Sequence, residues 1–262
     1  QKMLFDKLKR SKFVKFTGNL NVKKNHYKLV INSDPTHSII KKYFYRKIEK
    51  NYSSVAYTTT ILHEKIKNNT AYQNFTKNGP IAFLPISNTH TSIVWSVKNK
   101  SDAEKIVLNY EARLNFLKMI SVGFYEVIGC TNKLEKFDLT FEFLRRTVLS
   151  RVIFVGDITH KIHPIAGQGW NMTLRDINIL VSILKEKLNK GYDIGDLGIL
   201  KEYEKKTKAS NLLFAMSIDL IRKAFRSQSP AISQLRKKSF SIASQPTVMN
   251  KIIDLADKGL RF

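Results

Sequence analysis

The sequence RVIFVGDITHKIHPIAGQGWNMTLRDINIL, residues 151–180, decides the fold of this chain. It opens with Val152 to Val155, a continuous apolar run of β-branched and aromatic residues that predicts a strand buried on both faces. Gly156 and Asp157 end the run, and a loop containing Pro164, Gly167 and Gly169 follows. Beyond the loop, apolar residues recur at helical spacing, at Ile177, Leu180, Val181, Leu184 and Leu188. The stretch therefore predicts a strand, a glycine-rich loop and a helix.

The start of the predicted helix is a candidate ligand site. Free backbone N–H groups and the positive end of the helix dipole lie there, at the C-terminal edge of a sheet, where anionic or electron-rich ligands bind. Asp157 would accept a hydrogen bond from a ligand hydroxyl, and Gly167 and Gly169 would let the backbone approach a flat ring, because neither has a Cβ. The residues alone leave a second interpretation open, a tight turn that binds nothing.

The order of residues in this stretch resembles the second flavin-binding motif of the aromatic-ring hydroxylases related to para-hydroxybenzoate hydroxylase. The run HPIAGQGWN is most similar to the HPxAGQGxN of the ubiquinone-biosynthesis hydroxylases. The resemblance implies that the Asp157 carboxylate binds the ribityl chain of FAD, and that the segment from Pro164 to Asn171 lies against the isoalloxazine ring. The cofactor-binding residues that it implies here are Gly156, Asp157, Pro164, Ala166, Gly167, Gln168, Gly169 and Asn171.

A second short segment resembles another FAD contact of the same family. Tyr27 to Ile31 predicts a strand that ends in the turn Asn32-Ser33-Asp34-Pro35, and Ser38 to Tyr45 predicts the start of a helix. The family has ADG-x-x-S-x-x-R here, which contacts FAD and helps to handle the nicotinamide cofactor. Asp34 and Ser38 match this pattern, whereas Pro35 stands in place of glycine and Lys41 in place of arginine. The resemblance adds Asp34 to the cofactor-binding residues.

From residue 53 to about residue 97 the sequence pattern is that of β-strands. Val55 to Leu62 is rich in β-branched residues, and Ile81 to Ile86 leads through a turn into Thr91 to Val97, which predicts a hairpin. In the ubiquinone-biosynthesis hydroxylases, which this stretch again resembles, the middle sheet covers the substrate pocket. Phe83 and Trp95 are therefore candidate substrate contacts, and plain packing within the sheet is the favoured alternative. Asp102 to Ile128 predicts a largely helical segment, Phe137 to Phe143 a returning strand, and Leu200 to Phe225 a long packed helix.

Composition bounds the classes of function. The 262 residues include 45 Lys and Arg against 21 Asp and Glu, a net charge of +24 that favours anionic partners. The basic residues are scattered without a basic stripe interleaved with aromatics, so we expect no nucleic-acid partner; dispersed charge fits an anionic membrane surface better. The single Cys130 excludes an internal disulfide and a multi-cysteine zinc site. His160 and His163 form an H-x-x-H pair without a nearby third ligand, so no metal is expected.

The lone cysteine fits a reducing compartment. Neither a membrane-spanning run nor the apolar core of a signal peptide occurs, so the predicted location is cytoplasmic, with peripheral contact at the inner face of the membrane as the alternative. The first residue is Gln, which is typical of a fragment or a processed start. The sequence contains no G-x-G-x-x-G, the loop that holds the FAD pyrophosphate in this family. We therefore expect the first βαβ unit to be absent from these residues.

The predicted fold class is α/β: a split Rossmann-like FAD-binding domain with an inserted mixed β-sheet substrate domain. The predicted boundaries are 1–45 and 150–262 for the FAD-binding domain, with its C-terminal helices, and 46–149 for the substrate domain. The resemblance implies an FAD-dependent monooxygenase that hydroxylates the aromatic ring of a polyprenylphenol in ubiquinone biosynthesis, with NAD(P)H as co-substrate and O₂. Membrane contact or a ubiquinone-biosynthesis complex would be its macromolecular partners. Three alternatives stay open: a related flavoenzyme with another substrate, an inactive remnant, and a basic binding module.

Overall fold

A computed structural model describes residues 2–17, 27–37, 40, 46–131, 133–227 and 229–258. In chain order the elements are α1 (Lys2–Lys9), β1 (Val30–Asn32), β2 (Lys47–His63), β3 (Tyr72–Thr76), β4 (Gly79–Pro85), β5 (His90–Lys98), α3 (Asp102–Leu108), α4 (Tyr110–Ile120), β6 (Val127–Cys130), β7 (Glu135–Leu144), β8 (Val148–Leu149), β9 (Val152–Phe154), β10 (His160–Lys161), the short 3₁₀ helix η1 (Pro164–Ala166), α5 (Gly169–Asn189), α6 (Leu197–Arg226), α7 (Pro230–Ala243) and α8 (Pro246–Lys258). The predicted helix start at 38–45 falls, apart from residue 40, outside the described residues.

A small sheet has the order β1-β9-β8 and contains the strand predicted from Val152 to Val155. β1 pairs with β9 in parallel, whereas β8 pairs with β9 antiparallel. Both faces of β9 are covered: Ile153 and Val155 pack with α5 and α6, and Val152 and Phe154 pack on the opposite side. An entirely apolar strand suits this position, because a strand buried on both faces has no side for polar residues.

A larger, seven-stranded sheet has the order β10-β7-β2-β5-β4-β3, with β6 also paired to β2. Every one of its described strand pairs is antiparallel. The mixed pairing predicted for this sheet is therefore found only in the small one. The reason is the connections: short hairpin turns join β3, β4 and β5, and such turns join only antiparallel neighbours.

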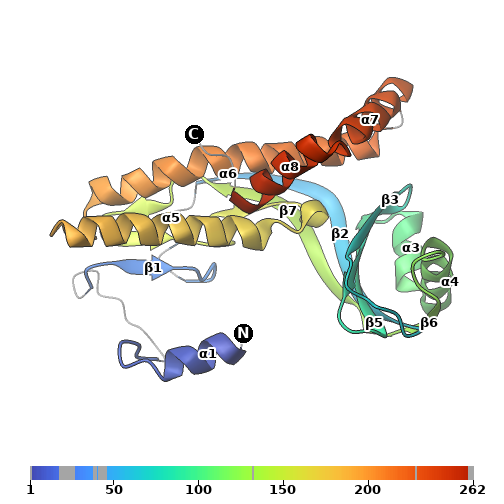
Figure 1. Cartoon of the computed structure of the whole chain (residues 1–262), viewed down its shortest axis with the longest axis horizontal. Coiled ribbons are helices and arrows are strands. Elements are labelled where there is room, and N and C mark those ends of the chain that lie inside the picture. Colours follow the sequence, from blue (N-terminus) through green and yellow to red (C-terminus); the bar gives the residue numbers. More distant parts are fainter. Residues whose placement is uncertain are drawn as a thin grey trace.

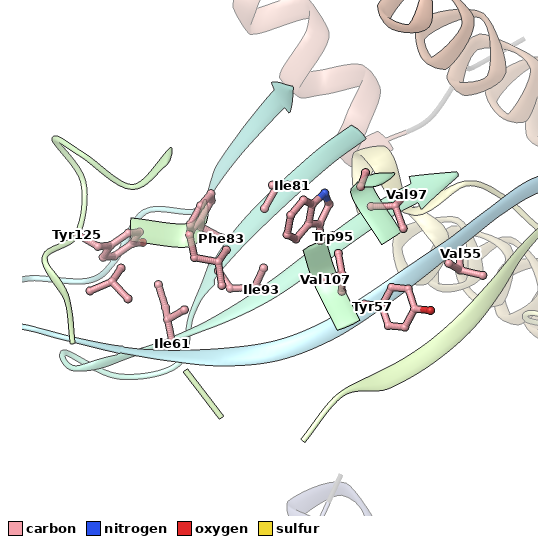
Figure 2. Packing of buried hydrophobic residues seen from close by; sticks show 13 residues of the cluster. Val55, Tyr57, Ile61, Ile81, Phe83, Ile93, Trp95, Val97, Val107 and Tyr125 are labelled. Carbon is pink, nitrogen blue, oxygen red and sulfur yellow. The ribbon is translucent and has the colours of Figure 1, made fainter. Parts of the chain in front are cut away.

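The core of the large sheet lies between its strands and helices α3 and α4. Figure 2 shows Phe83 and Trp95 inside this cluster beside Ile81, Ile93 and Val107. The two aromatic side chains are each 1% exposed, and the indole Nε1–H of Trp95 donates to the carbonyl oxygen of Asn78 at 3.1 Å. Packing accounts for both residues here, while substrate contact stays a prediction.

The largely helical prediction for Asp102 to Ile128 holds as far as Ile120, and the residues beyond it form a turn and the start of β6. The segment forms two helices that meet at Asn109, whose side chain accepts a hydrogen bond from the N–H of Ala112 and caps α4. The chain then turns at Gly123, which has a φ of +86°, and enters β6. The left-handed backbone of Gly123 allows the turn between α4 and β6, because residues with a side chain rarely take that conformation.

The long helices α5 and α6 run side by side over the small sheet, and the long strands β2 and β7 of the large sheet extend from beneath these helices towards β5 (Figure 1). Tyr52 and Phe141, from β2 and β7, pack with Ala215 of α6. The strand end and the glycine loop therefore lie where the helices and both sheets meet. Within the described residues, no helix is long and apolar enough to cross a membrane.

Candidate functional site

Two acidic side chains follow the C-terminal ends of the parallel strands β1 and β9. The backbone N–H of Val155 donates to the carbonyl oxygen of Asn32 at 3.1 Å, so the two strands end side by side. Asp34 and Asp157 each come two residues later and are exposed. Because parallel strands end at one edge of a sheet, both carboxylates leave from the edge where open α/β sheets bind ligands. The sequence prediction placed both residues at strand ends, and the structure brings those ends together.

Asp34 is already engaged in the turn. Its carboxylate accepts hydrogen bonds from the hydroxyl and the backbone N–H of Thr36, at 2.7 and 2.8 Å, and these bonds lower the pKa of Asp34. The N–H of Asp34 itself donates to the Asn32 side chain at 2.8 Å. Asn32 is buried, and its Nδ2 has no hydrogen-bond partner among the residues that the structure describes. The turn is thus preformed and keeps Asp34 ionised.

Asp157 begins a tight loop whose backbone needs glycine. Gly156 has a φ of +91°, a conformation that side-chain-bearing residues rarely adopt. Thr159 closes the turn by donating from both its N–H and its hydroxyl to the carbonyl oxygen of Gly156, each at 2.8 Å. No hydrogen bond from the described residues reaches the Asp157 carboxylate, which therefore remains available for a ligand.

The glycine loop folds as the 3₁₀ helix η1 followed by a left-handed turn. His163 caps η1, its Nδ1 accepting a hydrogen bond from the N–H of Ile165 at 3.3 Å. Pro164 begins η1 and Ala166 ends it, after which Gly167, with a φ of +60°, donates to the carbonyl oxygen of Pro164 at 3.0 Å. This backbone turns the chain directly into α5.

The N-terminus of α5 faces open space. A Cβ added at Gly167 or Gly169 would meet no atom within 4 Å. Gln168 precedes the helix without forming a side-chain cap, and its Oε1 instead accepts from the Asn171 side chain at 3.1 Å. The first N–H groups of the 21-residue helix thus have no partner within the described part of the chain, at the positive end of its dipole.

A buried polar network lies behind the loop. His160 Nε2 and Asp176 Oδ2 are 3.1 Å apart, with side chains 1% and 4% exposed. The Asn211 amide of α6 donates to both oxygens of Asp176 at 2.9 Å. Next to them a cavity of about 10 Å³, lined by His160, Asn211 and Tyr203 among others, has room for about one water molecule. Burial, followed by the charge of Asp176, raises the pKa of Tyr203.

Asp176 belongs to the motif that carries the family resemblance, but the sequence prediction named neither Asp176 nor Asn211 as a site residue. A signal was present: Asp176 lies on the same helical face as Met172, Leu180 and Ile183, all of which are buried. A carboxylate within an apolar stripe requires a buried partner, because an unpaired buried charge is costly. Neither this network nor any other set of three His, Cys, Asp or Glu side chains in the described ranges is arranged to hold a metal ion.

Comparison with known proteins identifies the fold first. The chain superposes on p-nitrophenol 4-monooxygenase PnpA from Pseudomonas putida DLL-E4 with a TM-score of 0.67 and 18% sequence identity, covering 89% of this chain and 60% of that one. The architecture is thus the α/β fold of FAD-dependent monooxygenases. The model of the FAD binding domain family matches residues 26–211, well over half of the chain. The chain belongs to that family.

Two of the relatives found by sequence have names that refer to ubiquinone or its precursors. The ubiquinone biosynthesis monooxygenase COQ6, mitochondrial, of Dictyostelium discoideum is 29% identical over 89% of this chain and 56% of the relative. The 3-demethoxyubiquinol 3-hydroxylase of Escherichia coli (strain K12) is 25% identical over 86% of this chain and 57% of that protein. The chain therefore spans just over half the length of these curated relatives.

The residues of the loop fit the flat ring and polyol chain of FAD. The open side at Gly167 and Gly169 leaves room for a ring against the backbone, and the free N–H groups of α5 can donate to its carbonyl edge. The unengaged carboxylate of Asp157 can accept from ribityl hydroxyls. The 262 residues contain no G-x-G-x-x-G for the pyrophosphate, so this fit concerns the ring and ribityl portion alone.

Proposed function

We propose that this chain is the part of an FAD-dependent monooxygenase that holds the flavin ring and forms the substrate sheet. The substrate would be a polyprenylated phenol in ubiquinone biosynthesis, hydroxylated on its aromatic ring with NAD(P)H and O₂ as co-substrates. One observation carries this proposal: the segment from Gly156 to Asn171 forms a strand end, an open glycine loop and an uncapped helix N-terminus. The names of the sequence relatives support the choice of substrate class.

The proposal divides the chain as the sequence predicted. Residues 1–45 and 150–262 would form the split FAD-binding domain, of Rossmann-like type, and residues 46–149 the substrate domain. The separate hydrophobic clusters of the small sheet and of the large sheet support this division. The test is limited proteolysis: cuts should concentrate near residues 46 and 149, and cuts spread evenly along the chain would contradict it.

FAD, when bound, supplies the oxidation chemistry, and the residues of the chain bind and orient it. Gly156, Pro164, Ala166, Gly167, Gln168, Gly169 and Asn171 would form its backbone cradle, with Asp34 and Asp157 at the strand ends. The positive end of the α5 dipole would favour electron-rich, reduced flavin. Phe83 and Trp95 would shape the substrate sheet from within, because both are buried.

Flavin titration tests the proposal directly. The purified chain is titrated in parallel with FAD, FMN and riboflavin while flavin fluorescence is followed. Because the residues present fit the ring and ribityl portion, we expect the three dissociation constants to agree within about tenfold. Absence of binding by all three flavins would overturn the flavin proposal and favour an inactive remnant or a basic binding module.

A pair of glycine variants locates the binding site. A leucine at Gly169 should block the approach of the ring, whereas a leucine at Gly129 should not, although an added Cβ meets open space at both positions. Neither glycine has a left-handed backbone, so neither variant is strained by its φ. Equal flavin affinity in Gly169→Leu and Gly129→Leu would show that the ring does not lie on the α5 N-terminus.

The C-terminal helices favour contact with an anionic membrane, where a polyprenylated substrate would dissolve. No residue of α7 is buried, and Leu235 and Ile242 on its apolar face are 65% and 47% exposed. Exposed Met249, Ile252 and Ile253 of α8 add apolar surface, and Lys237, Lys238 and Lys251 add positive charge. Exposed apolar helix faces flanked by lysine are typical of interfacial helices.

Vesicle sedimentation tests this contact. The chain should sediment with vesicles of anionic phospholipid and much less with neutral ones. Leu235→Glu should abolish the difference, whereas Leu84→Glu, a control at an exposed leucine of β4, should preserve it. If Leu235→Glu sediments like the unaltered chain, α7 does not bind the membrane. A ubiquinone-biosynthesis complex would then be the alternative partner.

A further inference from the structure

Helix α6 is connected to both histidines of the cofactor loop, each time through one intervening side chain. At its middle, Asn211 binds Asp176, which in turn contacts His160. Nearer its C-terminal end, Arg222 reaches His163 through the ring of Tyr52. His163 is the residue that caps η1 and directly precedes Pro164. The second connection is therefore one side chain away from the glycine loop.

The Tyr52 ring lies between a cation and an imidazole, and we call Tyr52, His163 and Arg222 the Tyr52 stack. The ring centroids of Tyr52 and His163 are 5.3 Å apart, with the planes at 63°. The guanidinium carbon of Arg222 lies 4.2 Å from the Tyr52 centroid, within the range of a cation–π contact. The exposed fractions of Tyr52, His163 and Arg222 are only 4%, 3% and 7%, so water competes little with these contacts.

Charge on α6 and β2 holds the stack in place. Asp219 accepts hydrogen bonds from Arg222 at 3.1 and 3.2 Å, and it pairs with Lys50 of β2 at 3.1 Å. Although burial opposes ionisation, the hydrogen bonds from Lys50 and Arg222 lower the pKa of Asp219. The Arg222 charge is thus neutralised beneath the Tyr52 ring, which allows it to stay buried.

The contact with His163 has a consequence for the loop. His163 Nδ1 accepts the N–H of Ile165, and this bond forms only while the imidazole keeps its orientation. Gly167 then donates to Pro164, which sets the left-handed turn at the start of α5. The T-shaped contact with the Tyr52 ring helps to hold the imidazole in that orientation.

We propose that Tyr52 and Arg222 are positioning residues for the flavin-facing loop, acting through His163. This inference rests on the proposed function, in which Pro164 to Asn171 face the flavin ring. Among the ring and cation–π contacts of the described residues, Tyr52 reaches the loop through His163, and Arg222 lies over Tyr52. Their role is to hold the loop in the shape that accepts the ring.

Hydrogen–deuterium exchange of the full chain, measured without flavin, tests the stack. Tyr52→Leu removes the ring face, and the exchange of the Ile165 and Gly167 amides should rise by roughly 5- to 30-fold. Arg222→Met should give a smaller rise, and Tyr52→Phe, which keeps the ring, should stay near the unaltered chain. The Val155 amide, bonded to Asn32 within the small sheet, should not change.

Arg236→Met is the matched control. Arg236 also lies over an aromatic ring, that of Phe225, at 5.5 Å, but on α7, in a contact that does not include the loop. Its removal should leave the Ile165 and Gly167 amides unchanged. Faster exchange at Val155 as well would mean general destabilisation, and equal exchange at Ile165 and Gly167 in Tyr52→Leu and Tyr52→Phe would overturn the inference.

FAD titration of the same variants separates this inference from the proposed function. We expect the FAD dissociation constant and the visible flavin spectrum to change in Tyr52→Leu and to be restored in Tyr52→Phe. If the unaltered chain binds no flavin, the proposed function fails while exchange still decides the stack. If the unaltered chain binds FAD and Tyr52→Leu changes neither affinity, spectrum nor exchange, the stack fails alone.

Discussion

Removal of the Asp157 carboxylate is expected to weaken FAD binding without unfolding the chain. Asp157 is exposed, follows the buried strand β9, and has no hydrogen-bond partner for its carboxylate among the described residues. A surface substitution of this kind changes the unfolding free energy by less than about 0.5 kcal/mol. A hydrogen bond to a charged group contributes roughly 1.5–3 kcal/mol, so Asp157→Ala should raise the FAD dissociation constant about 10- to 150-fold.

The assay is fluorescence titration with FAD, accompanied by urea unfolding. Asp157→Asn keeps a neutral acceptor and should lie between Asp157→Ala and the unaltered chain, because charge-assisted bonds are about twice as strong as neutral ones. Asp138→Ala, at an exposed aspartate of β7, is the control and should bind like the unaltered chain. Equal dissociation constants for the Asp157 and Asp138 variants would refute the ribityl role.

Three further predictions concern stability. Asp176→Ala should lower the unfolding free energy in urea by about 3–5 kcal/mol, because it leaves His160 and Asn211 buried without their partner; a loss under about 1 kcal/mol would contradict the network. Gly79→Ala should cost about 2–4 kcal/mol, since Gly79 has a φ of +104° and its Cβ would lie 1.9 Å from the carbonyl oxygen of Ser96; an unchanged thermal midpoint would disprove this. Burial, followed by the charge of Asp219, raises the pKa of Tyr52 from 10.0 to about 12. The stability that the neutral Tyr52 hydroxyl contributes is therefore fully present below pH 10 and is lost as the pH rises towards 12. The difference in unfolding free energy between the unaltered chain and Tyr52→Phe should therefore shrink by up to about 2–3 kcal/mol across that range, and a constant difference would rule out the raised pKa.

Local sequence patterns predicted an element well where its pattern of burial is simple, as in a strand that is apolar throughout. Val152 to Val155 is apolar throughout, and the structure covers both of its faces. Periodicity also located α5, but it did not decide which face packs. Ile177 and Val181 of the predicted stripe are 37% and 41% exposed, whereas Ile183 is buried. Both faces of the helix carry apolar residues, so the position of α6 makes the choice.

The candidate site divides in the same way. The segment from Gly156 to Asn171 contains its own turn signals. Glycine allows backbone conformations that other residues avoid, and proline fixes φ, so each acts at its own position. Asp102 to Ile128 lacks so strong a pattern: its apolar stripe ends at Leu117, and no comparable signal marked the end of α4 before the turn at Gly123.

The sequence by itself determined the strand, the glycine loop, the helix that follows and the family they indicate, since these depend on residues that are neighbours in the chain. Only the tertiary structure decided that Asn211 meets Asp176 and that the Tyr52 ring separates Arg222 from His163. These partners come from distant segments, and nothing in their local sequence specifies which of many polar side chains will face them. Packing of α6 against β2 and α5 brings them together, because burial of the apolar faces sets the relative position of the elements.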